Sequence, residues 1–336
     1  MSSSSVDWSA IADRGRLAPT PHNAQPFRLR IHPGHVDVVV DTDRILVHED
    51  RLNRYVAAST GIFLRTLEIA ARAQGVRLHT RPRDEVSYAG LNTGQGLVDV
   101  AAVSVAGSCT AVDDELLTRR QTNRLAYDGA PIEERDREAL RSLVTQAGHR
   151  LDFVDDERVP SIMALNAEAI IDNLQIPNER AELWSWTHLG RCPVVGDGLY
   201  GEALHQPDWE LLAAFLLPKL FAWRPVRKLA VARHVENNGR VPTLAILRGP
   251  FDDDAAAVAA GRLLMDVWLE LAARDIASQP FGSPLTNHLR RAELLKIIGL
   301  DPIGDKTDDV WFVLRLGHAA RPPRAPHLSS IVLEDE

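Results

Sequence analysis

Two carboxamides, Asn23 and Gln25, lie in a proline-rich segment at residues 16–27, RLAPTPHNAQPF. The prolines keep this backbone extended or turned, so the segment cannot continue as a helix or as a central strand. A carboxamide both donates and accepts hydrogen bonds, which suits the edge of a planar heterocycle such as a pyrimidine or flavin ring. A turn whose amides bind nearby backbone explains the same residues equally well.

A second group could bind phosphate, because Arg120, Thr122 and Arg124 follow one another at intervals of two residues. Two guanidinium groups and a hydroxyl at this spacing can converge on one phosphate from the end of a helix. Arginines on helices more often lie on a solvated surface, and that alternative stays open. The chain contains neither G-x-G-x-x-G after a strand nor G-x-x-x-x-G-K-[ST]. A standard dinucleotide fold and a P-loop are therefore excluded.

Four histidines occur early in the chain: His22, His32, His35 and His48. The HPGH sequence among them lacks Cys or Glu partners, so no metal site is predicted. Cys109 and Cys192 are far apart, which fits a reducing compartment and argues against a structural zinc site. A G-x-S-x-G elbow is missing, and no side chain stands out as a nucleophile or general acid.

The composition is that of a soluble globular protein: 336 residues, 45% hydrophobic and 25% charged. A net charge of -8 without blocks of Lys or Arg argues against nucleic acid and anionic membrane as partners. We find neither a signal peptide nor an apolar run long enough to span a bilayer, and therefore expect a cytoplasmic protein. Residues 1–5, MSSSS, are predicted to be a disordered tail.

Hydrophobic periodicity predicts alternating helices and strands. Helices are expected at 6–17, 56–74, from 113, from 131 to 148, 161–174, 180–186 and 251–277. Strands are expected in 27–40 as a hairpin, within 76–105, and at 150–154, 241–249 and 310–317. Residues 209–229 look helical but contain prolines, and the sequence does not place them.

The two long apolar helices end in similar sequences, EIAARAQG and ELAARDIA, and each is followed by a strand. This similarity predicts two versions of one fold in a single chain, an internal pseudo-dimer. The first repeat would cover residues 6–110 and the second 111–336, with a candidate lid or insertion at about 184–235.

The two motifs carry a family resemblance. APTPHNAQPF is similar to a segment of the FMN-dependent nitroreductase superfamily, and RRQTNR resembles its phosphate motif. The order of the motifs, with the Asn-Gln segment first, resembles the Acg-type tandem-repeat subfamily. ERAELWSW and LRLGHAARPPRAP also resemble segments of that subfamily. The implied fold class is α+β, nitroreductase-like, with a mixed or antiparallel sheet in each half.

The resemblance also implies a site for FMN. Arg120, Thr122 and Arg124 would hold the phosphate and ribityl chain, and Arg321 or Arg324 would add a phosphate contact. The isoalloxazine ring would be lined by Pro19, Thr20, Asn23 and Gln25, with Ser278 and Gln279 near its reactive edge. Departures from the family pattern are Phe27 in place of Trp, Thr20 in place of Ser, and Thr60 where Cys is frequent.

The function implied is an FMN-dependent oxidoreductase that moves electrons between NAD(P)H and a small nitro, quinone or unsaturated compound. Two alternatives stay open: an oxidase or dehydrogenase of an amine, peptide or heterocycle, and a non-catalytic protein that sequesters flavin. The expected partner is a small molecule, and the chain is expected to be a monomer with an internal pseudo-dimer or a homodimer.

Overall fold

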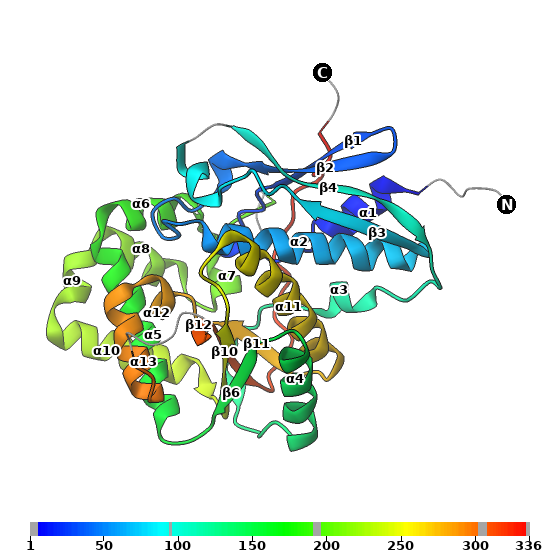
Figure 1. The fold of residues 1–336 in the computed structure, drawn as a ribbon. Helices are drawn as coiled ribbons and strands as arrows, with labels where there is room; N and C mark the ends of the chain where they lie inside the picture. The colour runs from blue at the N-terminus through cyan, green and yellow to red at the C-terminus, as the bar shows by residue number, and fades with distance from the viewer. Residues whose placement is uncertain (1–5, 94–95, 191–195, 302–307, 334–336) are drawn as a thin grey trace.

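The protein is described by a computed structural model at residues 6–93, 96–190, 196–301 and 308–333. The predicted disordered tail at residues 1–5 and Cys192 lie outside the described residues. Two four-stranded antiparallel sheets combine with helices in an α+β fold, which confirms the predicted fold class. Figure 1 shows one sheet above the two long helices and the other sheet below them.

The first half contains one helix, a hairpin, a long helix and two further strands. Their bounds are α1 (Trp8–Gly15), β1 (Phe27–His32), β2 (His35–Asp41), α2 (Arg54–Ala73), β3 (Val76–Pro82) and β4 (Leu97–Ser108). The strand order is β1-β2-β4-β3. Alternating apolar residues put Phe27 and Leu29 on the buried face of β1, as the hairpin prediction requires.

The second half has the same succession of elements. These are α4 (Glu134–Gln146), β6 (Arg150–Val154), β10 (Thr243–Gly249), α11 (Asp254–Ala273), β11 (Ala277–Pro280) and β12 (Asp309–Gly317). The strand order, β6-β10-β12-β11, corresponds to that of the first half. This correspondence agrees with two fused repeats, although the repeat and its boundaries stay an interpretation.

Helices α2 and α11 cross in backbone contact at two glycines. A Cβ atom on Gly61 would lie 1.9 Å from the carbonyl oxygen of Val258, and one on Gly261 would lie 1.8 Å from that of Ala58. In each pair the glycine of one helix faces a residue three positions before the glycine of the other. The small residues at the start of α2 therefore allow close approach of its neighbour, as their size indicated.

The connection between β6 and β10 is much longer than the corresponding connection in the first half. There, the turn Pro33-Gly34 alone joins β1 and β2. It holds α5 (Arg158–Gln175), α6 (Pro177–Ser185), α7 (Gly201–Leu204), α8 (Asp208–Leu216), α9 (Pro218–Ala222) and α10 (Arg224–Asn237). Prolines sit in the first turn of α6, α9 and α10, where the missing N–H is harmless. Residues 209–229, which the sequence left unplaced, are therefore successive short helices.

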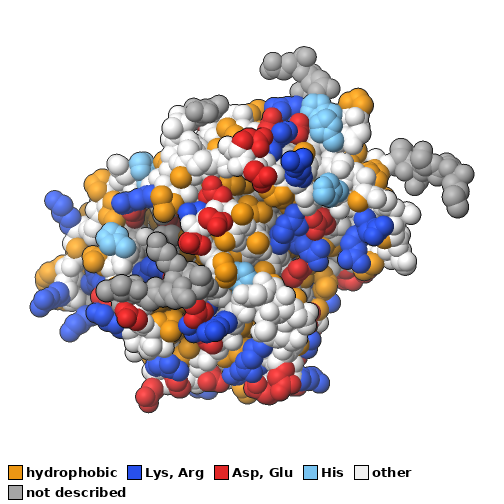
Figure 2. Space-filling view, in the orientation of Figure 1, with side chains coloured by type: hydrophobic (Ala, Val, Ile, Leu, Met, Phe, Trp, Pro, Cys, Tyr) orange, Lys and Arg blue, Asp and Glu red, His pale blue; other side chains and the backbone are white. Residues whose placement is uncertain are grey.

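These helices expose large apolar side chains: Trp209, Leu216, Leu217, Leu220, Trp223 and Leu229. Figure 2 shows Lys and Arg side chains gathered over α9 and α10, at the left edge of the molecule. The lid role of residues 184–235 stays a prediction.

The remaining elements are short, apart from α13. They are η1 (Pro21–Asn23), η2 (Thr42–Arg44), η3 (Tyr88–Thr93), α3 (Glu115–Arg119), β5 (Tyr127–Asp128), β7 (Thr187–His188), β8 (Leu199–Tyr200), β9 (Gly239–Arg240), α12 (Ser283–Thr286) and α13 (His288–Ile298). Among the described residues, no helix is both long enough and apolar enough to cross a bilayer.

The segment after β12 returns to the first half. Val332 bridges Leu29 in parallel, and Arg16 Nη1 donates to the carbonyl oxygen of Leu328 at 2.7 Å. The last described residues of the chain therefore lie beside β1, at the edge of the first sheet.

Replacing Gly61 with Ala should lower the free energy of unfolding by roughly 2 kcal/mol or more, because backbone atoms of α11 leave no room for the added methyl. Thermal unfolding of the purified variant measures the loss. Gly90→Ala is the matched control, since its nearest neighbour would be Ser87 Cβ at 3.9 Å. Equal melting temperatures for Gly61→Ala and wild type would contradict the described crossing.

Candidate functional site

The predicted phosphate motif follows α3 and lies against β11. Thr122 bridges Ser278 in parallel, and the backbone N–H of Asn123 donates to the carbonyl oxygen of Ser278 at 2.9 Å. The Asn123 side chain also donates to the carbonyl oxygen of Ala320 at 2.8 Å. The fold therefore brings the RRQTNR segment together with Ser278, and Asn123 fixes it in place, whereas the roles of these residues toward FMN stay a prediction.

Among the described residues, Arg120 pairs with no carboxylate. Its guanidinium lies 5.7 Å from the ring centroid of Trp268, and its buried Nε has no hydrogen-bond partner in this part of the chain. Burial lowers the pKa of Arg120 to about 10, so the group stays protonated at neutral pH. The residue as a whole is partly exposed, whereas its Nε is buried.

Arg124 is in a similar position. One weak hydrogen bond, 3.4 Å from Nη1 to the carbonyl oxygen of Ala203, is its polar contact on the described chain. Burial lowers the pKa of Arg124 to about 10, and the nearby Tyr127 opposes this in part. The guanidinium is therefore charged and only weakly bound.

A third arginine, Arg315 on β12, lies close to Arg124 and was not predicted from the sequence. It is fully buried and donates to the carbonyl oxygens of Asn123, Leu125 and Asn238. Its guanidinium stacks 4.1 Å from the ring centroid of Tyr127. Burial, with a smaller contribution from Arg124, lowers the pKa of Arg315 to about 10. The signal in the sequence was a single charge within the apolar strand VWFVLRLG.

Arg120, Arg124 and Arg315 form no ion pair with any carboxylate of the described residues. An enclosed cation without a counter-ion is costly, and an anion that enters the cluster removes the cost. Phosphate matches guanidinium groups in charge and in hydrogen-bond geometry. The unpaired Nε of Arg120 and the weakly bound Arg124 therefore fit a phosphate-bearing ligand, such as FMN.

A small cavity of about 30 Å³ adjoins Arg124 and is lined also by Gln279, His205 and Asn238. The buried Oε1 of Gln279 has no hydrogen-bond partner. A volume of this size holds only one or two water molecules. A ligand as large as a flavin enters only when neighbouring segments move.

Asn23 and Gln25 use their side chains to hold other segments of the chain. Asn23 Nδ2 donates to the carbonyl oxygens of Gly198 and Pro326 at 3.3 and 3.0 Å. Gln25 Nε2 donates to the carbonyl oxygen of Gly196 at 2.8 Å, and its Oε1 accepts from the N–H of Leu328 at 3.0 Å. These are the backbone contacts of the turn interpretation, although the partners are distant in sequence.

His22 connects this segment with the arginines. Burial lowers the pKa of His22 to about 4, with a smaller contribution from the positive charge of Arg124, whereas Glu182 acts in the opposite sense. Its Nε2 lies 3.2 Å from Oε2 of Glu49. Burial, together with Glu182, raises the pKa of Glu49 to about 7. The two predicted motifs thus lie close enough in space to influence each other electrostatically.

The other predicted residues have separate positions. Thr20 Oγ1 accepts from the N–H of Gln25 at 3.0 Å, next to the partly buried Pro19. Arg321 is 78% exposed and pairs with Asp275 at 3.6 Å, away from the enclosed guanidinium groups. Arg324 is exposed and donates to the carbonyl oxygen of Thr118.

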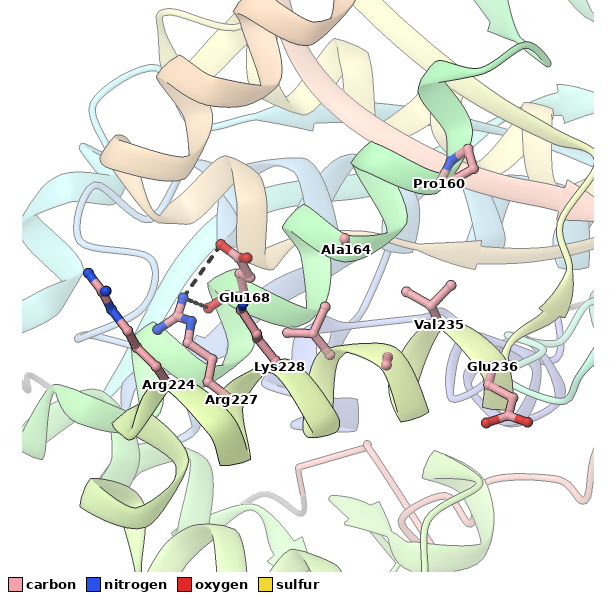
Figure 3. Close-up of a pocket in the computed structure, with 10 residues that line it drawn as sticks. Pro160, Ala164, Glu168, Arg224, Arg227, Lys228, Val235 and Glu236 are labelled. Carbon is pink, nitrogen blue, oxygen red and sulfur yellow. Dashed lines mark hydrogen bonds and ion pairs between the residues drawn. The ribbon is translucent and has the colours of Figure 1, made fainter.

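A larger groove of about 720 Å³ runs between α5 and α10 (Figure 3). Arg227 faces Glu168 across it, with Nη2 and Oε2 3.6 Å apart. None of the site residues predicted from the sequence lines this groove. It is a feature of the helical insertion and is distinct from the arginine cluster.

No family model matches the chain. A Mycobacterium tuberculosis protein with the provisional name NAD(P)H nitroreductase acg is 28% identical over 176 residues, covering 51% of this chain. The chain spans only 50% of that relative's length. A second protein of the same organism, provisionally named NAD(P)H nitroreductase Rv3131, is 24% identical over 80% of this chain and 74% of its own length.

A solved structure of a nitroreductase with bound FMN from Bacteroides fragilis aligns with a TM-score of 0.37 and 13% identity, over 67% of this chain and 100% of its own. The two sequence matches support a place in the nitroreductase superfamily with Acg-like relatives, as the resemblance predicted.

Buried histidines make stability depend on pH. Burial lowers the pKa of His234 to about 4, with a further contribution from Arg315, whereas an unfolded histidine titrates near 6.5. Between these values the unfolded chain binds the proton and the folded chain does not, so the free energy of unfolding falls as pH falls from about 6.5 to 4. His234→Gln should flatten that slope in denaturant titrations, whereas the control His79→Gln, at an exposed position, should leave it unchanged. An unchanged slope in His234→Gln would show that His234 is accessible to protons.

Proposed function

We propose that this chain, a relative of Acg-type nitroreductases, is an FMN-dependent oxidoreductase that takes electrons from NAD(P)H and passes them to a small organic acceptor. The observation that carries the proposal is that Arg124 and Arg315, together with Arg120 on the same RRQTNR segment, pair with no carboxylate of the described residues. Arg124 also lies near His22, in the segment that contains Asn23 and Gln25. An anion would compensate these charges, and two relatives are named NAD(P)H nitroreductases.

The arginines would hold the phosphate of FMN, with Thr122 and Ser278 beside them. Bound FMN would supply the redox chemistry at its own ring, so the protein needs no side-chain nucleophile. The cluster would orient the cofactor and favour its negative charge, because preformed cations in an enclosed site need little reorganisation. Pro19, Thr20, Asn23 and Gln25 would face the ring.

For the two carboxamides to reach the ring, their hydrogen bonds to the backbone of residues 196–198 and 326–328 have to be released. FMN binding would therefore displace these two segments from the Asn23 region. A site divided between both halves of one chain needs no second subunit, so a monomer is sufficient. The type of acceptor would depend on which residues replace the displaced segments.

A flavin-sequestering protein without turnover is the second candidate, and the closed geometry favours it. Both the insertion and the segment after β12 bind the carboxamides, which leaves little access to an acceptor. Anaerobic mixing with NADPH or NADH separates the two candidates. Rapid loss of the flavin absorbance supports the reductase, whereas tight FMN retention without bleaching by either nucleotide supports sequestration. Bleaching only by an amine or heterocycle would indicate an oxidase.

Arg124→Gln should weaken FMN binding about 10-fold or more, since a hydrogen bond to a charged group contributes about 1.5–3 kcal/mol. Titration of the apoprotein, followed by flavin fluorescence, measures the affinity. Riboflavin, which lacks the phosphate, is the diagnostic ligand: wild type should prefer FMN, and the variant should lose that preference.

Arg119→Gln is the matched control for this measurement. Arg119 belongs to the same motif, but its guanidinium pairs with the exposed Asp275 at 2.8 Å. It should bind FMN like wild type. Equal FMN affinity of Arg124→Gln and wild type, or equal affinity of wild type for FMN and riboflavin, would refute the assignment of the cluster to the phosphate.

A further inference from the structure

A second group of polar side chains lies at the end of the β1–β2 hairpin, and none of its residues belongs to the arginine cluster. His32 and His35 are directly opposite each other in the antiparallel register, joined by the turn Pro33-Gly34. Gly34 has a φ of +95°, which the tight turn requires and which glycine adopts without strain. Asp37 is two residues beyond His35 and so lies on the same face of the strand.

The three side chains converge. Nε2 of His32 lies 3.1 Å from Oδ2 of Asp37, and Nε2 of His35 lies 3.7 Å from the same oxygen. All three atoms lie within 4.8 Å of one another. In a tetrahedral zinc site with bonds of about 2.0–2.1 Å, neighbouring ligand atoms are about 3.3 Å apart. The group therefore has nearly the size of a metal site already.

The carboxylate is held in the orientation that a metal needs. Oδ1 of Asp37 accepts a hydrogen bond from Nη2 of Arg83 at 2.8 Å, and the Asp37 side chain is only 9% exposed. Oδ2 is left directed at the two imidazoles. An outer hydrogen bond of this kind is typical of carboxylates that bind metals, because it fixes the ligand before the metal arrives.

A hydrogen bond between one histidine and Asp37 would explain only part of this arrangement. The two imidazole rings are stacked, with centroids 4.6 Å apart and planes inclined by 19°. His32 is within hydrogen-bond distance of the carboxylate, whereas the stacked His35 lies 3.7 Å away from it. Because the nitrogen lone pairs of stacked rings run nearly parallel, a shared ion would need the exposed His35 ring to turn about its side-chain bonds.

We propose that His32, His35 and Asp37 bind one divalent transition metal ion of the zinc class. Two imidazoles and one carboxylate suit Zn²⁺, Ni²⁺ or Cu²⁺ better than Mg²⁺ or Ca²⁺, which prefer oxygen ligands. The histidines are 33% and 47% exposed, so water completes the coordination from the solvent side. The ion would fasten the turn end of the hairpin. The sequence predicted no metal here, because the HPGH sequence lacks Cys or Glu partners, and Asp37 was not considered.

The test uses the full chain without an affinity tag, freed of metal by a chelator and titrated calorimetrically with Zn²⁺ at pH 7.5. We expect one equivalent to bind, and Co²⁺ to give the visible absorption of a site with nitrogen ligands. His35→Gln and Asp37→Asn should each weaken Zn²⁺ binding by at least about 10-fold. Zn²⁺ affinity should also fall as the pH is lowered, because protons compete with the metal for the same nitrogen atoms.

His79→Gln is the matched control, because His79 lies exposed on β3 of the same sheet and should not change the titration. His35 is at an exposed strand end, so its substitution should leave the melting temperature of the metal-free protein unchanged. Wild type that binds no Zn²⁺, or a His35→Gln variant that binds it as tightly as wild type, would overturn the proposal. These outcomes do not depend on whether the chain binds FMN.

Discussion

The backbone contact between α2 and α11 is the constraint on which the rest of the structure depends. Gly61 and Gly261 let the two helices approach until carbonyl oxygens occupy the space where side chains would stand. Each helix is packed on the sheet of its own half, so the crossing fixes how the two sheets lie (Figure 1). The crossing determines how far apart the two predicted motifs lie, because each motif belongs to a different half. A wider separation of the helices would move His22 of the first motif away from Arg124 of the second.

The unpaired arginines determine which kind of ligand this arrangement of the two halves can bind. Most arginines of this chain pair with carboxylates, for example Arg65 with Asp266 and Arg262 with Glu68. Arg120, Arg124 and Arg315 instead have aromatic rings and carbonyl oxygens around them. Carbonyl dipoles orient a guanidinium but do not neutralise it. The free protein therefore retains a local positive charge, which an anionic ligand can stabilise more than water can within an enclosed site.

Much of the local structure could be predicted from the sequence. Gly75 follows α2 with a φ of +74°, which is typical of a glycine after a helix, and Asp253 accepts from the N–H of Ala256 at the start of α11. These features depend on neighbours within four residues. The role of Arg315 could not be predicted, because its partners at Asn123 and Asn238 are distant in sequence. Because side chains alternate along a strand, Asp37 can be predicted to lie on the same face as His35. The standard spacings of metal ligands, however, do not point to Asp37.

The carboxamide side chains of Asn23 and Gln25 are the point on which the sequence left two interpretations open. Sequence alone allowed either a ring-facing role or a backbone-binding turn, and the described geometry is that of the turn, with Gly196, Gly198 and Pro326 as acceptors. Two of these acceptors belong to the insertion between β6 and β10, which takes the place of the short Pro33-Gly34 turn in the other half. The insertion thus competes with any ring for the same amides. If the arginines hold FMN as proposed, access to the site would be a balance between those hydrogen bonds and the binding of that anion, and ligand binding would be coupled to movement of the insertion.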